Sequence, residues 1–110
     1  IWHEYMHHMA SLSVHFKMKR DEITQKITVP DSINIGIQSI IEEGVVYVAE
    51  SLIIQRKIEQ SDIDIEKLGK FRAWGAFRRQ TLNIRKYSNL DDIFDSIPED
   101  WENFTKGYLT

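Results

Sequence analysis

The sequence contains no cysteine, only two prolines, and no long hydrophobic run. Without cysteine, the chain can form neither a disulfide nor a thiolate metal site, which favours a cytoplasmic location. The longest apolar run, at residues 45–49, is far too short to cross a bilayer. Residues 1–110 contain no signal-peptide pattern. We therefore expect no membrane association, and any chemistry must come from histidine, carboxylate and other polar side chains.

An excess of charge of one sign is also missing. The 110 residues carry 14 Lys and Arg against 17 Asp and Glu, a formal net charge of −3. This balance gives no overall argument for binding nucleic acid or an anionic membrane. Hydrophobic residues make up 42% of the chain and aromatic residues 11%, which is enough for one small hydrophobic core. We expect residues 1–110 to form a single domain or a domain fragment.

Two of the four histidines stand in the sequence His3-Glu4-Tyr5-Met6-His7. Residues four apart on a helix project from one face, so both ring nitrogens can converge on one ion while Glu4 points beside it. Neutral imidazoles suit zinc, and the carboxylate can take a proton from water without occupying a coordination position. A shuffled sequence of this composition contains H-E-x-x-H with a probability of roughly 0.01. The other interpretation is a histidine-rich helix without metal, since His8 and His15 are also present.

A candidate third ligand lies in residues 40–50, and with it the sequence resembles the gluzincin zinc metallopeptidases. In those families a Glu-Gly pair supplies the third zinc ligand and is followed within two turns by a small residue, an aromatic and often an acid. Glu43-Gly44 with Tyr47 and Glu50 fits this outline. The aromatic falls one residue earlier than in the aminopeptidase-like pattern, and the spacer after His7 is longer than in thermolysin-like enzymes.

The resemblance implies a site and a reaction. It implies that His3, His7 and Glu43 bind zinc and that Glu4 is the catalytic general base for hydrolysis of a peptide or protein substrate. It also implies a Tyr, His or Arg that stabilises the oxyanion. The sequence does not rank the candidates for that role, which are Tyr87, Tyr108 and Arg85.

The resemblance further implies a fold that is mainly α, the helical C-terminal part of a zincin-like metallopeptidase domain. Zincins place a sheet before the helix of the motif, and its edge strand holds the substrate. The motif here begins two residues after Ile1. We therefore expect an upstream segment or a second chain to complete the active-site cleft.

Apolar periodicity predicts helices at residues 1–19, 33–59 and 61–82, and then two short helical pieces that break at Pro98. Residues 1–60 would hold the metal-site helices, and residues 61–110 a helical C-terminal part. Residues 23–29 are rich in Ile, Val and Thr and are a candidate short strand that ends at Pro30. Residues 31 and 32 would cap the second helix, and residues 61 and 62 the third.

Five positions of the second helix carry specific expectations. Glu43, Tyr47 and Glu50 share one face, and Glu50 is placed to hydrogen-bond a ligand histidine. Glu42 lies about 100° away and is expected in solvent. Gly44 would permit close packing against the first helix, so that the side chain of Glu43 reaches the metal; ordinary helix-helix contact is the alternative.

Charge is unevenly distributed in the second half of the chain. Residues 67–86 hold seven Lys or Arg and no acid, whereas residues 91–102 hold six acids and no base. A basic stretch with aromatic residues could bind nucleic acid, but the acidic tail can neutralise it internally. We expect this internal pairing rather than binding of nucleic acid.

Two other functional classes fit part of the sequence. The spacing of Glu4 and His7 also occurs in di-iron carboxylate bundles, with Glu43 and Glu50 as further ligands, but that site needs a second Glu-x-x-His, which the sequence lacks. A helical interaction module without metal, descended from a zincin, is the other alternative. Metal content separates the three: zinc, iron or none.

Overall fold

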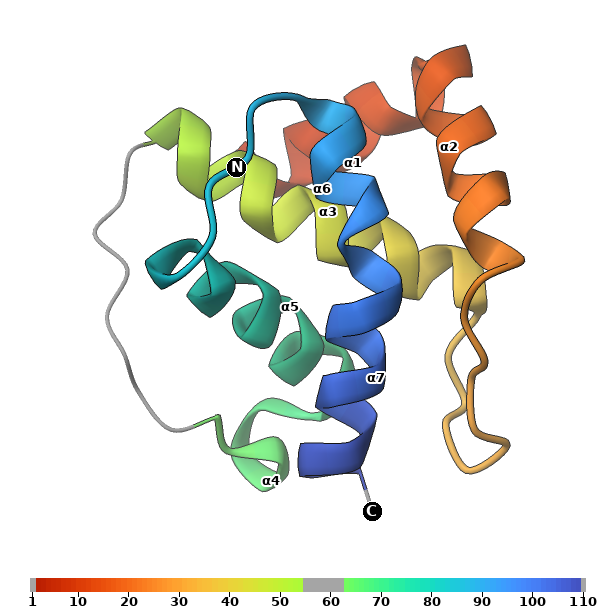
Figure 1. Ribbon diagram of the computed structural model, residues 1–110, viewed down its shortest axis with the longest axis vertical. Coiled ribbons are helices and arrows are strands. Elements are labelled where there is room, and N and C mark those ends of the chain that lie inside the picture. The colour runs from red at the N-terminus through yellow and green to blue at the C-terminus, as the bar shows by residue number, and fades with distance from the viewer. Residues whose placement is uncertain (1, 55–62, 110) are drawn as a thin grey trace.

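The computed structural model describes residues 2–54 and 63–109, and every regular element within these ranges is a helix (Figure 1). The prediction of a mainly α chain is confirmed. In chain order the elements are α1 (Trp2–Leu12), α2 (Val14–Thr24), α3 (Ile37–Ile54), α4 (Ile65–Leu68), α5 (Lys70–Gln80), the 3-10 turn η1 (Thr81–Asn83), α6 (Leu90–Asp95) and α7 (Ile97–Tyr108).

Helix α3 lies at the centre of the molecule. It contacts α1, α2, α5 and α6, and α7 crosses in front of it in Figure 1. Its buried side chains point in several directions rather than along one stripe, as expected for a helix that is covered on most of its surface. The fully buried ones include Ile40, Ile41, Val45, Val46 and Val48.

The contact between α3 and α5 is built around Trp74. Its indole Nε1 donates a hydrogen bond to the carbonyl of Ile40 at 2.7 Å, and the rings of Trp101 and Phe104 from α7 lie 5.0 and 5.5 Å from its ring. A Cβ at Gly44 would lie 3.0 Å from the same indole. The expectation that Gly44 packs against the first helix is therefore wrong, because it makes room for Trp74 of α5.

The first predicted helix is two helices. Ser13 interrupts it, and its side chain accepts a hydrogen bond from the backbone N–H of Phe16 at 3.0 Å, which caps α2. Helix α2 then continues to Thr24, so the strand at residues 23–29 is a wrong prediction. Its first residue, Ile23, is fully buried on α2, and burial on a helix face outweighs the β preference of this segment.

Other boundaries differ for local reasons. Gly69 adopts φ +82° and separates α4 from α5, a backbone conformation that favours glycine. Pro98 lies in the first turn of α7, where its missing N–H costs no hydrogen bond, and the break falls at Ser96 instead.

Helix α3 begins at Ile37 rather than at residue 33. Residues 55–59 of the predicted second helix and the cap at residues 61 and 62 lie outside the described residues.

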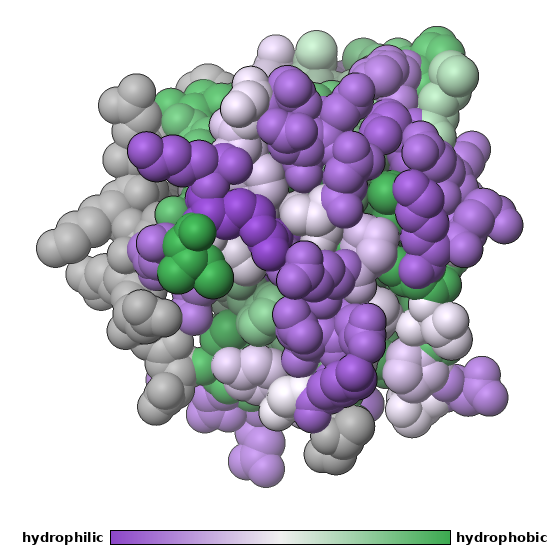
Figure 2. Space-filling model, in the orientation of Figure 1, coloured by the Kyte–Doolittle hydropathy of each residue, from purple (hydrophilic) through white to green (hydrophobic). Residues whose placement is uncertain are grey.

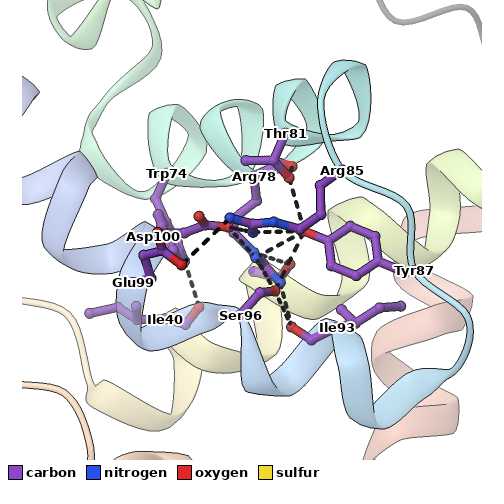
Figure 3. Close-up of polar contacts among 11 residues, drawn as sticks. Ile40, Trp74, Arg78, Thr81, Arg85, Tyr87, Ile93, Ser96, Glu99 and Asp100 are labelled. Atoms are coloured by element: carbon purple, nitrogen blue, oxygen red, sulfur yellow. Dashed lines mark hydrogen bonds and ion pairs between the residues drawn. The ribbon is translucent and has the colours of Figure 1, made fainter.

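The basic segment and the acidic tail pair internally, as expected. The guanidinium of Arg78 binds Asp100, which also accepts from Arg85 at 2.7 Å (Figure 3).

Figure 2 shows hydrophilic side chains along α7 on the face toward the viewer. None of the helices in residues 2–54 and 63–109 is long and apolar enough to cross a membrane.

Candidate metal centre

The packing of α1 against α3 brings His3, His7 and Glu43 together. Nε2 of His3 and Nε2 of His7 lie 3.1 Å apart, and Oε1 of Glu43 lies 2.5 Å from the first and 3.2 Å from the second. The two histidines are one helical turn apart on α1, so their rings reach the same point. These are the three residues that the sequence predicts as ligands.

The three atoms lie close enough together to share one small metal ion. In a tetrahedral zinc site with bonds of 2.0–2.1 Å, the ligand atoms lie about 3.3 Å from one another. Two of the separations here, 3.1 and 3.2 Å, are close to that value. The third, between His3 and Glu43, would have to widen by roughly 0.8 Å. Two imidazoles and one carboxylate form a donor set that suits zinc.

Both histidines are oriented by a second carboxylate at the other ring nitrogen. Nδ1 of His3 lies 2.8 Å from Oε2 of Glu50, and Nδ1 of His7 lies 2.7 Å from Oε1 of Glu42. Such contacts fix the tautomer that leaves Nε2 free to bind a metal, and they make the imidazole more basic. The expected hydrogen bond between Glu50 and one of the two histidines is present. The expectation that Glu42 lies in solvent is wrong, since its side chain is bonded to His7.

The carboxylates also change the protonation of His7. Burial works to lower the pKa of His7, but the hydrogen bonds to Glu42 and Glu43 outweigh it, and the pKa is raised above its ordinary value of 6.5. A proton and a metal ion would therefore compete for the same group of atoms, because a histidine must be neutral to bind metal.

One side of the cluster opens into a pocket of about 390 Å³. The side chain of Glu43 is only 6% exposed, whereas those of His3 and His7 are 29% and 31% exposed. The site is therefore closed by protein on one side and open on the other, as a site that admits a substrate must be. The pocket is lined by His3, Glu4, Glu43, Tyr47, Glu50, Arg72 and Arg79.

Glu4 lies in the wall of this pocket and is exposed. It is not one of the three residues whose ligand atoms converge. Glu50 is not one of them either, because it occupies the outer nitrogen of His3. The di-iron interpretation expects Glu4 and Glu50 among the metal ligands, but neither belongs to the cluster of converging ligand atoms in the described residues.

Tyr47 forms the floor between α3 and α5. The Tyr47 ring packs edge-on against the ring of His3, with the two centroids 4.7 Å apart. On the α5 side, the guanidinium of Arg79 lies 4.7 Å from the centroid of the Tyr47 ring. Burial, followed by the charge of Glu43, raises the pKa of the Tyr47 phenol, while Arg79 and Arg72 oppose that rise. The phenol therefore keeps its proton and stays a hydrogen-bond donor at neutral pH.

Sequence reasoning missed the basic side of the pocket. The oxyanion candidates are elsewhere: Arg85 and Tyr87 belong to the network around Arg78, and Tyr108 stacks on the ring of Phe104. The basic residues that do line the pocket are Arg72 and Arg79. The sequence feature that could have predicted them is their separation by seven residues, which places both on one face of a helix. The glycine between them lets that face approach a neighbouring helix closely.

The cluster, its outer carboxylates and the pocket thus belong to three helices, α1, α3 and α5. Comparisons of the chain with models of protein families, with curated proteins and with solved structures found no match.

Proposed function

We propose that this protein is a zinc-dependent hydrolase of peptide bonds, with His3, His7 and Glu43 as the metal ligands. The observation that carries the proposal is the convergence of Nε2 of both histidines and Oε1 of Glu43 on one point, beside an open pocket. The resemblance of the H-E-x-x-H and Glu-Gly segments to the gluzincins gives the class of reaction.

Three carboxylates around the cluster have a part in this proposal. A bound zinc ion would polarise the substrate carbonyl and make water a better nucleophile at neutral pH. Glu4 lines the pocket without joining the ligand cluster, so its carboxylate is free to accept the proton of the attacking water and pass it to the leaving amine. Glu42 and Glu50 hold the ligand histidines in position.

The outer carboxylates also favour this function over a metal-free interaction module. Such a module has no need to gather the carboxylates of Glu42, Glu43 and Glu50 around two histidines, because three neighbouring negative charges repel one another. A protonated histidine offsets part of that repulsion, in line with the raised pKa of His7, and a divalent cation at the centre of the group would offset more of it. The arrangement is therefore better suited to holding a metal than to packing alone.

Metal analysis and one substitution test the proposal. The purified chain should contain about one zinc per molecule, and Glu43→Ala should remove it. Glu4→Gln should keep its zinc and lose at least about 100-fold in peptide turnover, the usual scale of general-base catalysis. Zinc content is measured by elemental analysis, and turnover with a mixture of quenched fluorescent peptides.

Three outcomes would overturn the proposal. A chain that binds no zinc would favour the interaction module, and a chain that holds two iron atoms would favour the di-iron site. A Glu4→Gln variant that retains both zinc and full activity would show that the H-E-x-x-H motif is coincidental, and would favour the interaction module.

A further inference from the structure

Two arginines of α5 stand in the wall of the same pocket as the candidate metal ligands. Arg72 and Arg79 are seven residues apart, which is close to two helical turns, so they lie on one face of α5. Gly75 lies between them and contacts the ring of Tyr47, where a Cβ would come within 2.3 Å of a ring carbon. The close approach at this glycine places both guanidiniums beside the floor of the pocket.

These guanidiniums lack the carboxylate partners that arginines of this molecule have elsewhere. Arg78 and Arg85 both bind Asp100, but within residues 2–54 and 63–109 no carboxylate lies within 4.0 Å of a guanidinium nitrogen of Arg72 or Arg79. Nε of Arg79 is buried and has no hydrogen-bond partner among the same residues. A buried donor without a partner is costly, so the guanidinium of Arg79, which lines the pocket, is not fully satisfied by the described residues.

The charge of the pocket depends on the metal. Its wall carries the three carboxylates of Glu4, Glu43 and Glu50 and the two guanidiniums of Arg72 and Arg79. This set has one net negative charge by itself and one net positive charge with a divalent cation. Counting Glu42, which faces His7, the metal-loaded site is neutral overall, so an anion would be attracted by the local positive charge of the two guanidiniums on α5.

We propose that Arg72 and Arg79 bind a carboxylate of the substrate, and that the site acts on peptides with a free carboxylate close to the bond that is cleaved. The proposal rests on the function proposed above and adds its substrate class. A guanidinium presents paired donors that match the two oxygens of a carboxylate. The pocket volume of about 390 Å³ lies within the range of about 300–1,000 Å³ that is usual for small-ligand sites.

Small bifunctional probes test this proposal without any need for turnover. The monohydroxamates of succinic and glutaric acid carry a metal-binding group at one end and a carboxylate at the other. The matched probes have that carboxylate converted to a primary amide. Titration calorimetry with the zinc-loaded chain should show that at least one acid binds about tenfold or more tightly than its amide, because a hydrogen bond to a charged group is lost in the amide.

Substitutions then assign the preference to the arginines. Arg72→Gln and Arg79→Gln should each reduce the ratio of acid to amide affinity, and the double variant should remove it. Lys70→Gln removes one positive charge from α5 at an exposed position outside the pocket, so it should keep the ratio. A defect in folding or in zinc content weakens the acid and the amide equally, and the ratio is therefore insensitive to it.

The outcomes separate this proposal from the one it rests on. If both probes bind the zinc-loaded chain equally, the carboxylate site is wrong and the metal site stands. If the acid is preferred but the ratio survives in the double variant, Arg72 and Arg79 are not the carboxylate site. If the chain holds no zinc and binds neither probe, the proposed function itself fails.

Discussion

At the scale of single residues, each candidate ligand histidine is held at both ring nitrogens. The inner nitrogens of His3 and His7 face Glu43, and the outer ones face Glu50 and Glu42. A ring held in this way loses little rotational freedom when it binds a metal. The outer carboxylates should therefore influence metal affinity without touching the metal.

We predict that Glu50→Gln and Glu42→Gln each lower zinc affinity by about 10- to 100-fold, the usual cost of losing an outer-shell carboxylate. Glu43→Ala should lower it further, because it removes a ligand. Glu66→Gln, at an exposed position of α4, is the matched control and should leave affinity unchanged. Competition with a fluorescent zinc chelator measures all four variants. Equal losses for Glu43→Ala and the two outer variants would remove Glu43 as the third ligand.

The sequence predicted the inner residues of this site better than the outer ones. Helical periodicity identified His3 and His7 as residues that share a face, and the resemblance of Glu43-Gly44 to the gluzincin pair identified the third converging residue. Glu42 was missed by the same rule, since it lies about 100° from Glu43. His7 lies one turn along α1 from His3, and its ring is placed so that its two nitrogens face two successive residues of α3. This detail depends on how the two helices cross, which a single-helix pattern does not contain.

At the scale of the elements, the pocket depends on how closely α3 and α5 approach. Tyr47 of α3 fills the space over Gly75 of α5, and its ring also contacts His3 of α1. A side chain at residue 75 would therefore move the tyrosine, and through it one wall of the candidate metal centre.

We predict that Gly75→Ala destabilises the protein by about 1–3 kcal/mol, the usual cost of overpacking, and also weakens zinc binding. The added Cβ would lie 2.3 Å from a carbon of the Tyr47 ring. Gly107→Ala is the control, because a Cβ at this helical position meets nothing within 4 Å. It should stabilise the protein by up to about 1 kcal/mol. Urea unfolding, with and without zinc, measures both effects, and a neutral Gly75→Ala would mean that Tyr47 can move freely.

The helices themselves were predictable, but their interruptions were not. Long apolar periodicity identified the helical segments around residues 14, 45 and 75. The breaks at Ser13 and Gly69 depend on a cap worth about 1 kcal/mol and on one positive φ angle, at +82°. Such small local preferences are decided by how the flanking helices pack, so the pattern of residues alone left each pair as one continuous helix.

At the scale of the whole molecule, one buried arginine joins α5 to three other helices (Figure 3). Arg78 is fully buried. Its Nε donates to the carbonyl of Gly44 on α3 at 3.1 Å, and Nη2 donates to that of Ile93 on α6 at 2.6 Å. Nη1 binds the carboxylate of Asp100 on α7. The opposite charges of the two segments predicted such pairing, but not which arginine would be buried.

This network also reaches the candidate metal centre. Gly44, whose carbonyl accepts from Arg78, directly follows Glu43, so Arg78 helps to fix the backbone that carries the third ligand. Burial lowers the pKa of Arg78, and Tyr87 and Asp100 oppose that effect. The guanidinium stays protonated, and these partners offset the cost of burying its charge.

We predict that Asp100→Ala costs about 3–5 kcal/mol of stability, because it leaves the buried charge of Arg78 without its counter-ion. Asp100 also binds Arg85, so both guanidiniums lose a partner. Glu102→Ala, two residues further along α7, breaks only the exposed pair with Lys106 and should leave the stability nearly unchanged, because a solvent-exposed ion pair is screened by water. Urea unfolding of the two variants measures the difference. An Asp100→Ala variant as stable as Glu102→Ala would mean that the remaining hydrogen bonds of Arg78 suffice to hold its charge, and that α7 is not needed to fix the backbone beside Glu43.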